Sequence, residues 1–209
     1  MPGDRRCGAP MAEYGRCSKL GAVPRLARTS LSAEGTMGSE TKSAFSRALI
    51  SDGPSLPDHA QLFAPFIGSW DLIVRWYDKA GKVVRTEAGE WHFSWVLEGR
   101  AIQDVWIVPP RSLRYANAPY EYGSSIRFYD PVTEAWQSTW IGPMHRVVWT
   151  FAAKQRGPAV VLETTPDVSP AMRWSFTDIT ANSFLWKNEI KDDDSWRTQQ
   201  TFEANRQAT

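Results

Sequence analysis

The sequence has little of several features that would narrow its function. Cysteine occurs only at Cys7 and Cys17, ahead of the segments with strand character, which argues against a disulfide framework and favours a cytoplasmic location. No apolar run approaches the roughly 18 residues that a membrane-spanning helix requires. The 24 basic and 23 acidic residues nearly cancel, to a net charge of +1, so charge indicates neither nucleic acid nor an anionic membrane as a partner.

Motifs of the common cofactor-dependent and hydrolytic enzymes are also missing. The sequence has no Gly-x-Gly-x-x-Gly, no phosphate loop and no Gly-x-Ser-x-Gly elbow. Its three histidines, His59, His92 and His145, are not spaced as a metal-binding triad. We therefore predict no metal and no cofactor. A haem-binding barrel with His145 as the axial ligand is kept as a second alternative.

Tryptophan, by contrast, is abundant, and all 11 tryptophans lie between Trp70 and Trp196. The pattern is clearest in residues 66–77, where apolar side chains take every second position: Trp70, Leu72, Val74 and Trp76. This period is typical of a strand with one buried face. Similar segments separated by turn signals recur to about residue 202. They predict an all-β fold, an antiparallel up-and-down barrel of about ten strands.

Three segments are expected along the chain. Residues 1–38 have no helical or strand period and predict a disordered leader. Residues 39–64 predict short helices that pack on the barrel, one capped by Ser39 and one after Pro57. Residues 65–206 predict the barrel itself. Its longest interruption, residues 111–122, is typical of either a lid over the open end or a surface loop.

Four short motifs resemble a known family. They are Phe66-Ile67-Gly68-Ser69-Trp70, Trp95-Val96-Leu97-Glu98-Gly99-Arg100, Arg127-Phe128-Tyr129-Asp130-Pro131 with Trp136 and Trp140, and Ser183-Phe184-x-Trp186. Together they resemble an uncharacterised bacterial family of small lipocalin-like barrels, a domain of unknown function. The resemblance covers about Leu62 to Arg206. It implies a calycin-type antiparallel barrel with an internal cavity, and it carries over no catalytic residues.

The strand register selects candidate ligand-binding residues. If Trp70 points into the barrel, neighbouring strands turn their tryptophan-bearing faces inward as well, with a few polar side chains in the same register. Flat apolar walls with few polar groups are the usual form of a small-molecule site. The alternative is that most of these rings simply fill a narrow interior. The residues predicted to bind a ligand are Trp76, Trp106, Trp136, Trp140, Trp186, Ser138, Asn188 and Gln200.

Asp104 and His145 are the candidate catalytic residues. Burial of Asp104 among indoles would raise the pKa of its carboxyl toward the range that acid–base catalysis needs. The alternative for Asp104 is a structural pair near the rim with Arg127 or Arg100. His145 follows a turn and is expected at the open end of the barrel.

Two further expectations concern side chains outside the predicted pocket. His92 and Glu90 share a strand face, and the register turns that face outward, away from the pocket. In lipocalins an arginine of the final strand packs on the opening tryptophan. The resemblance implies this structural role for Arg197 or Arg206, against Trp70.

Several functions remain open from the sequence. The first is binding of a hydrophobic, aromatic or polycyclic, small molecule in a tryptophan-lined cavity. The second is a cofactor-independent isomerase, cyclase or lyase that uses acid–base groups in the same cavity. A third is a structural barrel with a filled interior. The expected partner is a small hydrophobic molecule, with no nucleic acid and no membrane, and a homodimer is compatible with the sequence.

Overall fold

The computed structural model describes residues 43–115 and 120–208. The predicted leader and the predicted Ser39 cap lie outside these residues. Within the described ranges, no helix is long and apolar enough to span a membrane.

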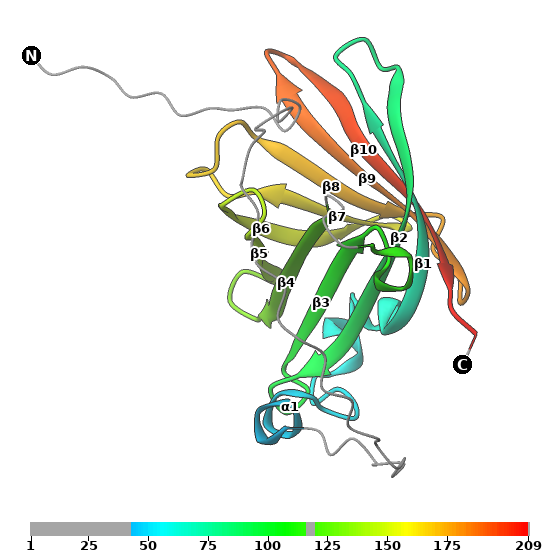
Figure 1. The fold of residues 1–209 in the computed structure, drawn as a ribbon. Coiled ribbons are helices and arrows are strands. Elements are labelled where there is room, and N and C mark those ends of the chain that lie inside the picture. Colours follow the sequence, from blue (N-terminus) through cyan, green and yellow to red (C-terminus); the bar gives the residue numbers. More distant parts are fainter. Residues whose placement is uncertain (1–42, 116–119, 209) are drawn as a thin grey trace, which may run out of the picture. The chain divides into compact units, whose positions relative to one another are not determined.

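Ten antiparallel strands close into a barrel, as the alternating pattern predicted (Figure 1). Each strand pairs with its neighbours in the chain, and β1 pairs with β10, so the topology is up-and-down and leaves no free sheet edge. The strands are β1 Gly68–Tyr77, β2 Val83–Val96, β3 Ala101–Val108, β4 Glu121–Asp130, β5 Ala135–Gly142, β6 Val147–Arg156, β7 Ala159–Thr164, β8 Met172–Thr177, β9 Ser183–Asp192 and β10 Ser195–Arg206.

The antiparallel order sorts the turns into two ends. We call the closed end the one that holds the β2–β3, β4–β5, β6–β7 and β8–β9 turns, together with the start of β1. The open end holds the β1–β2, β3–β4, β5–β6, β7–β8 and β9–β10 turns. A short 3-10 helix, η3 Arg111–Leu113, lies in the β3–β4 connection at the open end.

Short helices precede β1 and cover the closed end. The helix α1 spans Ala44–Leu49 and begins after Ser43, whose hydroxyl accepts a hydrogen bond from the Ser46 backbone N–H. The backbone N–H of Leu97, in the β2–β3 turn, donates to the Leu49 carbonyl. Two 3-10 helices follow, η1 Asp58–Ala60 and η2 Ala64–Phe66. The segment of these helices places Phe63 and Phe66 inside the barrel at its closed end.

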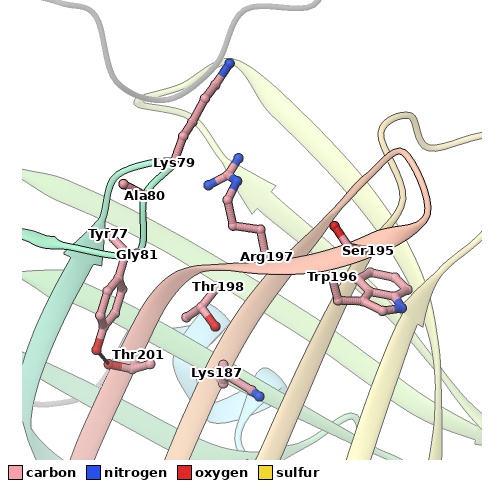
Figure 2. A pocket seen from close by; sticks show the side chains of 10 residues that line it. All are labelled: Tyr77, Lys79, Ala80, Gly81, Lys187, Ser195, Trp196, Arg197, Thr198 and Thr201. Atoms are coloured by element: carbon pink, nitrogen blue, oxygen red, sulfur yellow. Dashed lines mark hydrogen bonds between the residues drawn. The ribbon is translucent and has the colours of Figure 1, made fainter.

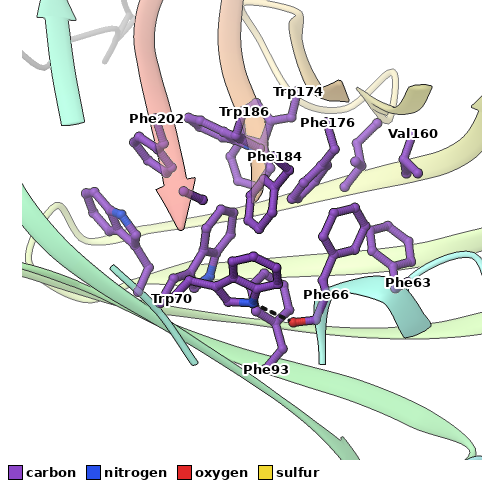
Figure 3. Close-up of a cluster of buried hydrophobic side chains, with 14 of the residues drawn as sticks. Phe63, Phe66, Trp70, Phe93, Val160, Trp174, Phe176, Phe184, Trp186 and Phe202 are labelled. Atoms are coloured by element: carbon purple, nitrogen blue, oxygen red, sulfur yellow. Dashed lines mark hydrogen bonds between the residues drawn. The ribbon is translucent and has the colours of Figure 1, made fainter. Parts of the chain in front are cut away.

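Aromatic side chains fill the closed end (Figure 3). Phe63 and Phe66 are fully buried, and the Phe66 ring centre lies 4.5 Å from that of Phe176. The Trp70 ring centre lies 4.7 Å from that of Phe184, and the Trp70 indole N–H donates to the Phe66 carbonyl at 2.7 Å. These contacts tie η2, β1, β8 and β9 together. The closed end is therefore solid.

Arg206, at the end of β10, packs its guanidinium on the ring of Trp70. Its guanidinium carbon lies 4.1 Å from the Trp70 ring centre, and it donates to the carbonyls of Ile67 and Pro65 at 2.7 and 2.9 Å. A side chain at Gly68, where φ is +122°, would lie 2.6 Å from this guanidinium. Of the two expected arginines, Arg206 is the one that packs on Trp70. Arg197 instead binds Asp192 at the open end.

Candidate functional site

Cross-strand register determines which side chains share the barrel interior. Trp70 on β1 lies opposite Trp91 on β2, which lies opposite Trp106 on β3, and all three are buried. Opposite residues lie on the same face of a sheet, so this relation can be followed around the barrel. It places inside every residue predicted to bind a ligand: Trp76, Trp106, Trp136, Trp140, Trp186, Ser138, Asn188 and Gln200.

Trp136 belongs to the solid closed end. It is 1% exposed, and its ring centre lies 5.2 Å from that of Phe63. Its position inside the barrel therefore reflects core packing, and a ligand entering from the open end would not reach it.

A layer of five rings crosses the barrel above the closed end. We call it the aromatic floor: Trp106, Trp140, Trp174, Trp186 and Phe202. Neighbouring ring centres around the layer are 6.1, 5.9, 5.5, 4.2 and 5.6 Å apart, so the contacts form a closed circuit. Four of the rings are buried, and Trp140 is partly exposed. The floor separates the packed lower interior from the upper one.

The upper interior is accessible from the open end. Trp76, Trp140 and Trp149 all face inward by register, yet each is only partly buried. All three lie within two residues of the open-end termini of their strands, so their exposed surface is at the open end of the barrel. The space between the floor and the open end is called the upper chamber below. Its walls are these tryptophans together with Arg85, Glu87 and Glu121, which the same register turns inward.

Two inward-facing glycines hold Trp140 against the wall. A Cβ at Gly123 on β4 would lie 2.2 Å from the Trp140 ring, and a Cβ at Gly142 on β5 would lie 2.9 Å from the indole nitrogen. Real Cβ atoms do not approach that closely, so larger residues here would displace the ring. The two glycines therefore seat the largest side chain of this wall outside the centre of the chamber.

Asp104 and Arg127 form a buried pair beneath the floor. They are 0% and 1% exposed; an Arg127 N–H donates to the carboxylate, which also accepts from the Ser125 backbone N–H at 3.2 Å. Burial raises the pKa of the Asp104 carboxyl, and the Arg127 charge offsets this only in part. Burial likewise lowers the pKa of the Arg127 guanidinium, against the opposing charge of Asp104.

The pair does not lie near the rim of the barrel, where the sequence analysis placed it as an alternative. Arg127 lies over the Phe63 ring, with 4.6 Å from the guanidinium carbon to the ring centre, so the pair contacts the closed-end plug. Asp104 is paired with Arg127, as one of the sequence alternatives held, but deep in the barrel. It does not present a free carboxylate to the upper chamber.

Several interior polar atoms have no hydrogen-bond partner among the described residues. They include the indole nitrogens of Trp106, Trp174 and Trp186, the hydroxyl of Ser138 and the Oδ1 atom of Asn188. Buried polar groups in folded proteins usually have partners. Among the same described residues, unpartnered nitrogens also occur in the packed lower interior, at the indoles of Trp91 and Trp136 and at Arg127.

Charged residues surround the open end. Arg85 stacks on Trp76, with 4.1 Å from its guanidinium carbon to the ring centre, and it also binds Glu87 and Glu121. His145 lies at this end, as predicted, with its Nε2 atom 3.7 Å from Glu121 Oε2. The part of the chain that the structure describes contains no group of three or more histidine, cysteine or acidic residues arranged to hold a metal ion.

The His145–Glu121 contact predicts a pH-dependent contribution to stability. The neighbouring Glu121 carboxylate raises the pKa of His145 above its ordinary value, while burial opposes the shift. A histidine with a raised folded-state pKa stabilises the fold fully below its unfolded pKa of about 6.5, and loses that effect as pH rises through the folded value. The stability difference between wild type and His145→Gln should therefore be larger at pH 5.5 than at pH 8.5.

Urea unfolding at the two pH values measures this difference, and Glu121→Gln is the matched background. Arg85 and Glu87, which face Glu121 at the rim, are unchanged in every protein compared. In the Glu121→Gln background the effect of His145→Gln should become nearly independent of pH. An equal effect at both pH values in the wild-type background would contradict the pairing.

Trp196 faces outward, although the sequence predicted that the tryptophan-bearing faces of the strands turn inward. Trp196 on β10 stacks beneath Arg173, with 4.5 Å from the guanidinium carbon to the ring centre, and Trp196 lies opposite the exposed Lys191. The β9–β10 register shifts between Thr198 and Gln200. Strict alternation would turn Trp196, Thr198 and Gln200 to the same side, but because of the shift only Gln200 faces inward. The bulge is the reason that alternation alone placed Trp196 inside.

Glu90 and His92 face outward, as predicted, and they anchor the β3–β4 connection. Glu90 accepts hydrogen bonds from the backbone and side chain of Arg111, at 3.0 and 2.6 Å, and lies 3.3 Å from His92. Burial raises the pKa of Glu90, but the bonds from Arg111 outweigh it and the net shift is downward. The pair therefore has a structural role in holding η3 against β2.

A separate groove of about 560 Å³ lies on the outer surface near the open end (Figure 2). It includes Lys187 and Thr201, cross-strand partners that alternate with the inward-facing Trp186 and Phe202. The hydroxyl of Tyr77 lies 3.1 Å from that of Thr201 across the groove. Two of the basic residues in its lining are paired, Lys187 with Glu189 and Arg197 with Asp192. No sequence pattern indicated this groove.

The fold and the interior define the class of the protein: an up-and-down β-barrel with an aromatic, partly accessible interior. The chain matches no model of a known protein family, and no curated protein is significantly similar to it. The resemblance to a lipocalin-like family therefore remains an expectation from the sequence motifs.

Proposed function

We propose that the protein binds a planar, apolar aromatic small molecule in the upper chamber of the barrel. The observation that carries the proposal is the partial exposure of three inward-facing rings, Trp76 and Trp149 above the aromatic floor and Trp140 within it. A water-accessible space walled by indoles is the usual environment of an aromatic ligand.

The wall chemistry favours an aromatic occupant over a flexible chain. Indole rings present flat, polarisable faces, and aromatic pairs gain energy beyond simple burial when their centres are 4.5–7 Å apart. The floor already contains a stacked pair of this kind, Trp106 and Phe202, with ring centres 5.6 Å apart. A flat ligand on the floor would extend this stacking.

The same geometry gives less support to acid–base catalysis. Asp104 is held beneath the floor by Arg127, and its carboxylate accepts hydrogen bonds from within the protein. His145 stands at the rim, bound to Glu121. A catalytic group must come within hydrogen-bond reach of the reacting atom. Neither candidate is placed in the wall beside the proposed ligand.

Calorimetric titration of the protein with naphthalene tests the proposal. Trp149→Leu removes a chamber wall and should weaken naphthalene binding about 3- to 10-fold, the loss of one aromatic contact. Trp196→Leu is the matched control, because it removes an indole from the outer face, and it should leave the affinity unchanged. No heat of binding with the wild-type protein, or equal losses in both variants, would contradict the proposal.

A further inference from the structure

Asn188 is the buried polar side chain at the boundary between the aromatic floor and the upper chamber. It lies on β9, two residues beyond Trp186, and its cross-strand partners are Trp174 on β8 and Gln200 on β10. Its exposure is 3%, so its amide is removed from bulk water. Two of the five floor rings thus flank an amide that faces the same interior.

The hydrogen bonds of this amide are incomplete. Its Nδ2 donates to Gln199 Oε1 at 3.3 Å, so the amide nitrogen has a partner. Its Oδ1 has no donor within reach among the described residues. A buried carbonyl oxygen without a donor is unfavourable, so a molecule that offers a donor here would gain a hydrogen bond that water does not compete for.

The neighbouring indole rings lack the opposite kind of partner, a hydrogen-bond acceptor. The indole N–H groups of Trp174 and Trp186 are buried donors without acceptors in the described part of the chain. One end of the chamber floor thus holds one free acceptor and two free donors on adjacent strands. A protonated amine would satisfy only the acceptor, and an ether or ketone only the donors. A hydroxyl group donates and accepts at once.

We infer that the upper chamber selects an uncharged aromatic molecule that carries a hydroxyl group, which donates to Asn188 Oδ1 and accepts from an indole N–H of Trp174 or Trp186. The inference rests on the proposed function and adds the ligand class. The ligand binds as the neutral phenol. A phenolate would lose its hydration among the floor rings and would have no proton to donate to Asn188.

Three related compounds separate the ligand class from aromatic binding in general. They are 2-naphthol, which donates and accepts; 2-methoxynaphthalene, which only accepts; and naphthalene, which does neither. Calorimetric titration of the full chain at pH 7 should give 2-naphthol an affinity about tenfold higher than that of 2-methoxynaphthalene, the effect of one hydrogen bond. This comparison uses the wild-type protein and does not depend on any variant.

The residue assignment is tested with Asn188→Leu, which keeps the size of the side chain and removes its polar atoms. This variant should bind 2-naphthol and 2-methoxynaphthalene equally, with naphthalene unaffected or bound slightly better. Gln199→Met is the matched control, because it removes only the partner of Nδ2, and it should retain the preference. Near-ultraviolet circular dichroism verifies the fold of both variants.

The outcomes distinguish this inference from the proposed function. If all three compounds bind equally, or 2-methoxynaphthalene binds best, the hydroxyl assignment is wrong while aromatic binding stands. If Asn188→Leu folds and keeps the tenfold preference, Asn188 is not the residue that accepts the hydrogen bond from the ligand hydroxyl. If none of the three compounds binds the wild-type protein, the proposed function fails together with the inference.

Discussion

Arg127→Met is expected to destabilise the protein by about 3–5 kcal/mol, the usual effect of removing one partner from a buried ion pair. The reason is the position of Asp104, which is 0% exposed and would keep its carboxylate without the neighbouring positive charge. Urea unfolding at pH 7 gives the free energy of unfolding directly. This is the largest loss of stability that we predict for a single polar residue.

The double variant Asp104→Asn/Arg127→Met separates the lost charge from lost packing. An asparagine at 104 keeps an oxygen for the Ser125 backbone N–H and carries no charge. The double variant should therefore recover stability to within about 1–2 kcal/mol of the wild type. A double variant as unstable as Arg127→Met alone would mean that the contacts of the Arg127 side chain with Phe63 and Phe93 carry the effect.

The second prediction concerns the seat of Trp140. Gly123→Val places side-chain atoms where the Trp140 ring lies, since even a Cβ would be 2.2 Å from it. The ring must move away from the wall, and the chamber is the accessible space beside it. We expect naphthalene affinity to fall by at least about tenfold, because the displaced indole occupies the proposed binding volume. Calorimetric titration measures the loss.

A compensating change makes this prediction specific. In Gly123→Val/Trp140→Leu the smaller side chain leaves room for the valine, and affinity should return toward that of Trp140→Leu alone. Gly53→Val is the control for a glycine replacement with no neighbour within 4 Å of the new Cβ, and it should bind as the wild type does. If Gly123→Val binds naphthalene as tightly as the wild type, Trp140 does not line the binding site.

The barrel could be predicted because each of its strands is specified by a pattern of residues close together in the sequence. In β1, the apolar residues Trp70, Leu72, Val74 and Trp76 at every second position specify a half-buried strand, and similar segments with short turns leave few topologies. The same alternation placed Asn188 and Ser138 inside. It also brought Asp104 near Arg127, since strands close in the sequence are neighbours in the barrel.

Features that depend on packing across the barrel could not be read from the pattern. Phe63 and Phe66 precede β1 and carry no strand period, so nothing in the sequence shows how deeply they fill the closed end. The bulge before Gln200 reverses the facing of Trp196, and no local signal marks it. The division into a solid lower half and an accessible upper chamber arises from these contacts.

The central claim is that a ligand reaches the upper chamber and stops at the aromatic floor. The most direct measurement is the set of tryptophan indole N–H resonances of ¹⁵N-labelled protein during titration with 2-naphthol. The account predicts shifts for Trp76 and Trp149 above the floor and for Trp140, Trp174 and Trp186 within it, with Trp70, Trp136 and Trp196 unchanged. Shifts confined to Trp196 on the outer face, or no shifts at all, would contradict it.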